Sequence, residues 1–403
     1  MLRLPSLVEI RAERQRRSTD EAVPQDQRPE AVKERCKTLA GFVKEAWHVL
    51  EPGKRLSWGW HQQAICDHLE AITWGTFLKM GFRNRLLINV PPGSMKSLLV
   101  SVFWQAWEWY IGFPANRFLA TSYGPGPVDR DNLKFQLLVH SDWYQALNPT
   151  RFARNATDEM VNTSTGSRMS TPFASLTSLR GDRLVLDDPH STESAESEND
   201  RDKTTRKFRE GALNRLNDQE ISAIVVIMQR LHAKDLSGVI ERDMKGYIHL
   251  MLPMEFEPDR RCKTPIFTDP RKKDGELLDP VRFPAEAVEL IKVEMGSFAY
   301  AGQYQQRPSP REGALFKRQW FEGKMRRVAP EGTRWVRHWD LAASVETRSD
   351  RSAGVKLGIA PDKSYWIAHA KVMREEGHEV RRIIKSIAET DGKQVVISLP
   401  QDP

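Results

Sequence analysis

Apolar residues alternate between two spacings from residue 86 to about residue 252. Short runs of aliphatic and β-branched residues predict strands, and the stretches between them carry apolar residues at helical spacing. The predicted strands span residues 86–90, 117–122, 168–170, 184–186, 221–228 and 247–252. This alternation predicts an α/β domain with a mostly parallel sheet and helices on both faces, in which ligands bind at the carboxyl ends of the strands.

A second pattern begins near residue 332 and predicts three strands, a helix and a fourth strand, which is the opening of an RNase H-like α/β fold. Its elements are strands at 335–339, 352–359, 365–373 and 394–399 and, before the last strand, a helix at 377–390. The predicted division of the whole chain is a charged arm (1–34), an α/β domain (35–252), a connecting segment (253–331) and a second, incomplete α/β domain (332–403).

The first predicted strand runs into the segment PPGSMKS. The turn and the start of the following predicted helix consist of Gly93, Ser94, Met95, Lys96 and Ser97. Backbone N–H groups at a helix N-terminus and a lysine hold phosphates, and a serine hydroxyl binds Mg²⁺. The usual phosphate-binding loop has two glycines where this chain has Val90 and Met95. Taken alone, the segment is therefore equally compatible with a plain strand–turn–helix connection.

Paired carboxylates follow another predicted strand. The segment DRLVLDDPH carries Asp187 and Asp188 directly after the apolar residues 184–186. An aspartate at a strand end completes the Mg²⁺ site of a nucleoside triphosphatase, although such a pair also fits a helix cap or a solvated turn. Because the two segments occur in the order that the chemistry needs and both follow strands, together they predict a nucleoside-triphosphate site, and hence a P-loop ATPase fold for residues 35–252.

Two further segments add candidates to this site. The most strand-like run of the chain, ISAIVVIM, ends in Gln229 and Arg230, which suit a group that senses the γ-phosphate. A core strand whose polar end meets solvent is the alternative. Gln62, in the segment WHQQAI, is a candidate for reading the adenine edge, and an amphipathic surface helix is an equally simple explanation.

With these residues aligned, the chain resembles the large terminase subunit of tailed bacteriophages, the motor that packages viral DNA. The resemblance runs from about residue 60 to the last residue. It rests on the segments WHQQAI, PPGSMKS, RGDRLVLDDPH, IMQRLHAKDLSG, GQYQQRPSPREGALF and HWDLAAS. The last two are the specific ones, because a generic ATPase has no reason to carry a motor-to-nuclease junction or the first strand of a nuclease.

The resemblance implies a role for each matching residue of the ATP site. Lys96 is expected to bind the β- and γ-phosphates, and Ser97 and Asp187 are expected to bind Mg²⁺. Asp188 stands where many such motors have a glutamate that orients the attacking water, and its shorter side chain leaves its reach to that water open. The candidates for the expected arginine finger are Arg180, Arg230 and, as a weaker third, Arg130.

The resemblance also implies a metal-dependent endonuclease in the second predicted domain. Such nucleases hold two ions, Mg²⁺ or Mn²⁺, between carboxylates on adjacent strands. Asp340 and Asp402, which end the first and fourth strands, are the expected ligands, and Asp350 fits a turn better. An RNase H-like domain needs a further strand, helices and a late carboxylate, and none follows Pro403. The nuclease is then either truncated or an unusually short member of its class, and we expect it to cleave DNA little or not at all.

Composition limits the alternatives further. The chain has 61 Lys and Arg against 54 Asp and Glu, a mild excess that alone does not establish nucleic-acid binding. Three distant cysteines predict a reducing compartment and no structural zinc. The sequence has neither the apolar core of a signal peptide nor a run long enough to cross a bilayer. Basic clusters, which suit phosphate contacts or simply solvated surfaces, lie at 11–17, 259–263, 271–273 and 317–327.

The resemblance implies a viral DNA-packaging motor subunit in the host bacterial cytoplasm. The expected cofactors are ATP and Mg²⁺, with Mn²⁺ as an option at the nuclease site. The expected partners are double-stranded DNA, the portal protein, the small terminase subunit and further copies of the chain in a ring on the procapsid, with no membrane. Two other classes stay open, a helicase- or repair-type nucleic-acid ATPase and a DNA-binding scaffold that does not hydrolyse ATP.

Overall fold

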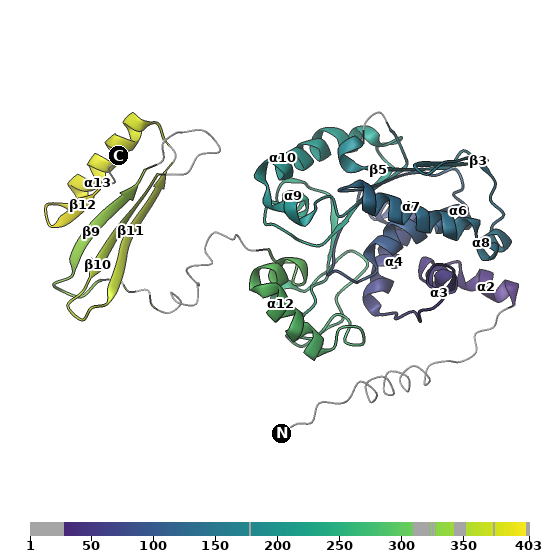
Figure 1. The fold of residues 1–403 in the computed structure, drawn as a ribbon, viewed down its shortest axis with the longest axis horizontal. Coiled ribbons are helices and arrows are strands. Elements are labelled where there is room, and N and C mark those ends of the chain that lie inside the picture. Colours follow the sequence, from purple (N-terminus) through teal and green to yellow (C-terminus); the bar gives the residue numbers. More distant parts are fainter. Residues whose placement is uncertain are drawn as a thin grey trace, which may run out of the picture. The chain divides into compact units, whose positions relative to one another are not determined.

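A computed structural model of the protein describes residues 28–176, 179–308, 324, 326, 328–341, 352–373 and 375–399. The chain divides into two compact units, Met1–Arg311 and Glu312–Pro403. Both units combine helices with a β-sheet (Figure 1). Among the described residues, no helix has the length and apolar character needed to span a membrane.

An eight-stranded sheet forms the centre of the first unit, in the order β3-β4-β5-β2-β6-β7-β1-β8. The strands from β5 to β8 in this order are parallel, and β3 and β4 form an antiparallel edge. The strands are β1 (Arg85–Asn89), β2 (Arg117–Ser122), β3 (Phe152–Asn155), β4 (Glu159–Asn162), β5 (Ser167–Pro172), β6 (Arg183–Asp187), β7 (Ala223–Met228) and β8 (Ile248–Met251). The predicted α/β class is confirmed, whereas the β3–β4 edge was not predicted.

Helices cover both faces of this sheet (Figure 1). Ile88 and Val225 belong to one core with the early helices, and Leu87 and Val226 belong to the opposite core with Phe208 and α11. Since side chains alternate along a strand, burial on both faces requires the continuous apolar runs seen in the sequence. The helices are α2 (Pro29–Arg35), α3 (Leu39–Leu50), α4 (Trp60–Thr73), α5 (Thr76–Lys79), η1 (Leu98–Phe103, a π-helix), α6 (Trp104–Ile111), α7 (Pro125–His140), α8 (Asp142–Leu147), η2 (Phe173–Ser175), α9 (Thr192–Glu196), α10 (Glu198–Lys207), η3 (Phe208–Ala212), η4 (Leu213–Arg215), α11 (Leu236–Asp243), η5 (Pro258–Arg260) and α12 (Ala285–Gln303).

The segment after β8, which the sequence predicts to be a connection, packs on the first unit. Met254, Phe256 and Leu278 are buried in it. Arg271 is almost fully buried, where it pairs with Asp269 at 2.7 Å and donates to main-chain carbonyl groups. The basic cluster at 271–273 therefore contributes its arginine to packing rather than to an exposed surface.

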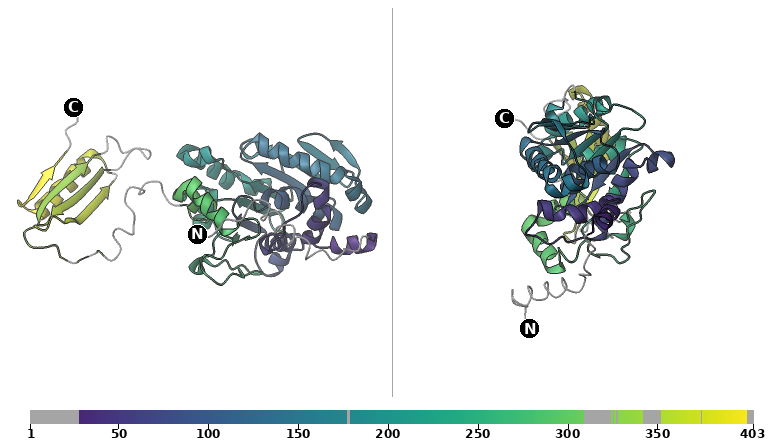
Figure 2. Two further views of the ribbon diagram at one scale, coloured as in Figure 1. Left: turned by 60° about the horizontal axis from the view of Figure 1, so that its bottom comes forward. Right: turned by 90° about the vertical axis from the view of Figure 1, so that its right-hand side faces the viewer.

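The second unit holds a four-stranded sheet in the order β11-β10-β9-β12, with α13 on one face (Figure 2). Its elements are β9 (Arg334–Asp340), β10 (Ser352–Ile359), β11 (Tyr365–Met373), α13 (Gly377–Asp391) and β12 (Val395–Ser398). Trp339 and Val380 form the core between the sheet and α13. The predicted order of three strands, a helix and a strand is confirmed, with ends within two residues of the prediction.

The other face of the second sheet carries a group of exposed apolar side chains. Val336 pairs with Leu357 in the strand register, and Leu357 pairs with Ile367, so these side chains share one face. Val396 pairs with Val336 from the neighbouring strand. All four side chains are exposed to solvent.

Candidate nucleotide-binding site

The carboxyl ends of three neighbouring parallel strands bring the first site residues together. In the strand registers Asn89 of β1 pairs with Met228 of β7, and Asp187 of β6 pairs with Ile227. The segments that follow these strands therefore meet at one edge of the sheet. The sequence predicted this meeting of PPGSMKS with the two aspartates, and the geometry agrees with it.

The turn after β1 keeps the backbone form of a glycine-rich loop with a single glycine. Gly93 has a φ of 82°, and Met95 has a φ of 60°, in the region that glycine adopts without cost. The Ser94 hydroxyl donates to the carbonyl of Pro91 at 2.9 Å. Lys96 follows as the first residue of the helix that continues into η1 and α6. Although position 95 is not a glycine, the turn still leads from β1 into a helix that begins at Lys96.

Lys96 and Asp188 form an ion pair in this edge of the sheet. The side chain of Lys96 is buried, and that of Asp188 is 24% exposed. The second carboxylate oxygen of Asp188 accepts the backbone N–H of Gln229 at 3.2 Å. The residue expected to bind phosphate is therefore held by the residue expected to orient water, and the latter also contacts the segment after β7.

Asp187 is buried beside this pair. Its Oδ2 accepts the hydroxyl of Ser101 at 3.3 Å, and its Oδ1 has no hydrogen-bond partner in the described part of the chain. Burial raises the pKa of Asp187 and the charge of Asp188 adds to this, while Lys96 and a hydrogen bond from Ser97 act in the opposite direction. An orphan carboxylate oxygen beside a serine hydroxyl is a donor set that suits Mg²⁺, which takes oxygen ligands. The residues present thus fit the metal that the sequence implies.

Ser101 is a further candidate residue of this site that the sequence did not predict. It lies four positions after Ser97, so both hydroxyls belong to the same side of the helix that starts at Lys96. A serine at this spacing after the Lys-Ser pair was the available signal.

The two glutamine candidates have different surroundings. Gln62 is buried and caps α4, because its Oε1 accepts the backbone N–H of Gly59 at 2.5 Å. Its Nε2 lies 3.8 Å from the sulfur of Met95, next to the turn after β1. The side-chain oxygen of Gln229 is buried with no partner among the described residues. Both lie near the loop, and their contact with a nucleotide stays a prediction.

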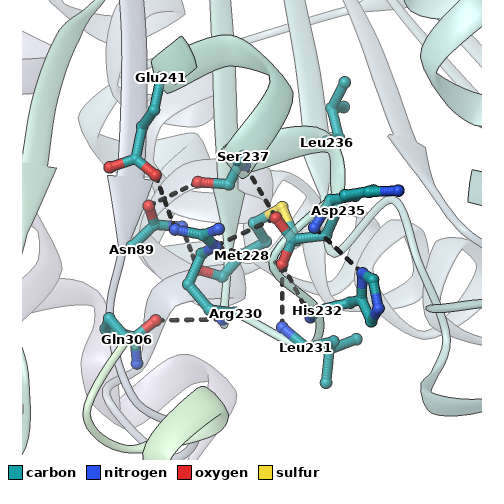
Figure 3. A network of polar contacts seen from close by, with 12 residues as sticks. Asn89, Met228, Arg230, Leu231, His232, Asp235, Leu236, Ser237, Glu241 and Gln306 are labelled. Carbon is teal, nitrogen blue, oxygen red and sulfur yellow. Dashed lines mark hydrogen bonds and ion pairs between the residues drawn. The ribbon is translucent and has the colours of Figure 1, made fainter. Parts of the chain in front are cut away.

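A buried polar network joins the end of β7 to α11 and to the segment after α12 (Figure 3). Nε of Arg230 donates to Asp235 at 3.0 and 3.2 Å, and its Nη1 donates to Glu241 at 2.7 Å. Asp235 also caps α11 by accepting the N–H of Gly238 at 2.8 Å. The backbone N–H of Arg230 donates to Gln306 at 3.1 Å. Arg230 is therefore fixed on several sides within its own chain.

The other two arginine candidates lie at opposite ends of the parallel strands, Arg180 at the amino ends and Arg130 at the carboxyl ends. Arg180 is exposed, donates to the carbonyl of Leu216 at 2.9 Å and precedes β6. At about 3.3 Å per strand residue it lies roughly 20 Å from Asp187. Arg130, on α7, donates to Asp131 at 2.8 Å. That hydrogen bond raises the pKa of Arg130, and the charges of Asp187 and Asp188 add to the shift, which places Arg130 on the side of the phosphate loop.

The predicted nuclease ligands are only in part within the described residues. Asp340 ends β9, pairs with Ala353 in the register and is exposed. Asp402 and Asp350 lie outside the described residues, as do the basic cluster at 11–17 and most of 317–327. Within the described ranges no three His, Cys, Asp or Glu side chains come together as a metal site. The donors among the described residues therefore do not make up a two-metal centre.

A parallel sheet that presents a lysine-ended turn and two aspartates at one edge is the arrangement of the P-loop nucleotide-binding class. No protein-family model matches this sequence, and no curated protein matches it. Among solved structures, the chain is similar to the large terminase of bacteriophage HK97, at 12% identity and a TM-score of 0.43, over 91% of this chain and 74% of that one. It is also similar to the large terminase of a thermophilic bacteriophage, at 9% identity and a TM-score of 0.37, over 83% and 76% of the two chains. A structure of this second terminase in complex with ATP-gamma-S gives 11% identity, a TM-score of 0.37 and coverage of 82% and 76%.

Proposed function

We propose that this protein is the ATP-hydrolysing motor subunit of a viral DNA-packaging machine, which moves double-stranded DNA into a procapsid. The observation that carries the proposal is the Lys96–Asp188 ion pair beside the buried, partly unpartnered Asp187 at the edge where β1, β7 and β6 end. The resemblance of the segments GQYQQRPSPREGALF and HWDLAAS to terminase sequences favours this motor over a helicase- or repair-type ATPase.

The site residues support a simple division of roles. Lys96, Ser97, Asp187 and the N–H groups of the turn would hold ATP and Mg²⁺. The metal ion, when bound, neutralises charge on the phosphate groups. Lys96 exchanges its partner Asp188 for phosphate, and the freed carboxylate of Asp188 can then orient the attacking water. Because Lys96 and Asp187 are buried, their charges act with little screening by solvent.

The positions of the arginines favour different roles for them. Arg180 lies at the amino end of β6, too far from its own Asp187 to act there, and is exposed. We therefore propose Arg180 as a finger that acts on a neighbouring subunit, which requires an assembly such as the expected ring. The buried ion pairs of Arg230 favour a role in holding the segment after β7.

The remaining parts of the proposal rest on the sequence resemblance. They are cutting of concatemeric DNA by an endonuclease that uses Asp340 and Asp402 with Mg²⁺ or Mn²⁺, contacts with the portal protein and the small terminase subunit, and action in the host bacterial cytoplasm. Metal-dependent nicking of plasmid DNA that is lost on Asp340→Ala would test the first of these.

The test of the motor is ATP turnover by the purified chain with no nucleic acid, with linear double-stranded DNA and with single-stranded DNA. A packaging motor should be stimulated most by linear double-stranded DNA, and Lys96→Ala should remove the activity. Equal or stronger stimulation by single strands would favour a helicase-type enzyme. Absence of turnover under all three conditions, with DNA binding retained, would identify a scaffold.

A further inference from the structure

The turn formed by residues 279–283 lies against the loop after β1 (residues 91–95), although the two are distant in sequence. If Gly93 carried a Cβ atom, that atom would lie 3.0 Å from Cζ of Phe283, 3.6 Å from Nη2 of Arg282 and 3.7 Å from Nε of Arg282. A Cβ at the first of these distances would force the Phe283 ring to shift. Gly93 is therefore a glycine for two reasons, its positive φ and the close approach of this turn.

The turn is held in place from inside the first unit. The backbone N–H of Phe283 donates to the carbonyl of Asp279 at 2.8 Å, and that of Arg282 donates to the Asp279 carboxylate at 3.1 Å. Asp279 is itself buried. The ring of Phe283 packs on the main core and stands edge-on to Tyr304, with 6.5 Å between ring centroids. The side chain of Arg282 is thus presented from a fixed backbone.

Arg282 brings a positive charge that has no carboxylate partner in the described part of the chain. Its guanidinium lies 5.7 Å from the ring centroid of Phe283, and no ion pair of its side chain is found among the described residues. Of the other cations on this side, Lys96 is paired with Asp188 and Arg130 with Asp131. Both Arg282 and Gly93 are exposed, so this side of the loop is open to a ligand. A nucleoside triphosphate keeps a net negative charge after it binds Mg²⁺, and an unpaired guanidinium suits phosphate oxygens.

We propose that Arg282 is a second phosphate-binding cation of the nucleotide site, placed over the loop by Phe283 and Asp279. It acts in the same chain as Lys96, unlike the finger proposed for Arg180. This inference rests on the proposed ATP site and adds to it a preference for the nucleotide with the most phosphate charge.

The experiment measures direct binding of fluorescent mant-ATP, mant-ADP and mant-AMP to the full chain in the presence of Mg²⁺, by anisotropy. The variants are Arg282→Gln and Lys96→Ala, the second of which tests the ATP site itself. The matched control is Lys273→Gln, which removes the same charge as Arg282→Gln from an exposed position of the same segment. For a partly solvated charge-assisted hydrogen bond we expect the Kd for mant-ATP to rise about tenfold in Arg282→Gln. The Kd for mant-ADP should rise less and that for mant-AMP should stay within about twofold, while Lys273→Gln should match the wild type.

Three other outcomes would contradict the role of Arg282 or the ATP site itself. If Lys96→Ala loses mant-ATP binding and Arg282→Gln keeps the wild-type Kd, the ATP site stands and the role of Arg282 is wrong. If Arg282→Gln weakens the three nucleotides equally, the arginine shapes the site without reading phosphate charge, and the proposal is again wrong. If the wild-type chain binds no nucleotide, both the proposed ATP site and the role of Arg282 fail.

Discussion

Replacing Arg230 by alanine should separate a structural arginine from a catalytic one. Arg230 is 7% exposed, and its guanidinium faces the carboxylates of Asp235, which is fully buried, and Glu241. Arg230→Ala would leave Asp235 as a buried negative charge without its cation. Arg180 provides the comparison, because it is exposed and donates a hydrogen bond to the carbonyl of Leu216.

The size of the effect follows from these contacts. Removal of one partner from a buried ion pair destabilises a protein by about 3–5 kcal/mol. Asp235 keeps the backbone N–H groups of Leu231, His232 and Gly238 as donors, and Glu241 is 38% exposed and can turn to water. We therefore expect the lower end, about 3 kcal/mol, for Arg230→Ala. The exposed Arg180→Ala should cost less than about 1 kcal/mol.

Scanning calorimetry of the full chain measures both variants against the wild type. A loss of about 3 kcal/mol from a unit of roughly 300 residues should lower the Tm of the first unit by about 4–6 °C. ATP turnover, measured well below that Tm, should survive in part in Arg230→Ala and be abolished in Arg180→Ala. A normal Tm together with abolished turnover in Arg230→Ala would refute the structural role, and a low Tm in Arg180→Ala would refute its assignment as an exposed, functional side chain.

Three further predictions concern the same unit. Lys96→Ala and Asp187→Asn should each lower ATP turnover by about 100-fold or more with unchanged circular dichroism, because each removes a charge that acts on the phosphates or the metal; turnover near that of the wild type in either would show that the site is elsewhere. Added to wild-type protein, inactive Arg180→Ala should reduce turnover by more than its share of the mixture, whereas a strictly linear mixing curve would show that the arginine acts in its own subunit. Burial lowers the pKa of His68, whose Nδ1 donates to Ala64 and whose Nε2 accepts the Thr264 hydroxyl, so the folded state disfavours its protonation. The unfolded chain therefore binds the additional proton below about pH 6.5, and the free energy of unfolding falls with decreasing pH. In urea unfolding, the free energy of unfolding of His68→Gln should fall less with decreasing pH than that of the wild type. An equal pH dependence in the two proteins would contradict this role of His68.

The main part of the fold could be predicted because its strands are buried on both faces. Residues 86–88 and 223–228 are continuous apolar runs for that reason, and a polar residue follows each of them directly. Because β1, β7 and β6 are parallel neighbours, their order alone is enough to predict that Lys96 and Asp188 lie close together. The β3–β4 edge escaped prediction because each strand has four residues of which only half are apolar, so they leave no apolar run.

The contacts between distant segments could not be read from the sequence. Nothing in the motif around Gly93 indicates that Arg282 and Phe283 approach it, because they come from a segment with the composition of a connection. In the same way, the contact between Arg230 and Gln306 joins two motifs that the sequence presents as separate. Such pairs depend on how the chain folds back after β8, and local periodicity carries no signal of that path.

The exposed face of the second sheet bears on how the protein behaves in a test tube. Val336, Leu357, Ile367 and Val396 form an exposed apolar strip on a chain whose sequence pI is about 9.2. At physiological pH the net positive charge makes the molecules repel one another. High salt screens this repulsion, whereas hydrophobic association through the strip remains. Preparations should therefore become turbid on salting or on approach to the pI, bind hydrophobic dyes while still folded, and be kept clear by low salt or by a mild detergent.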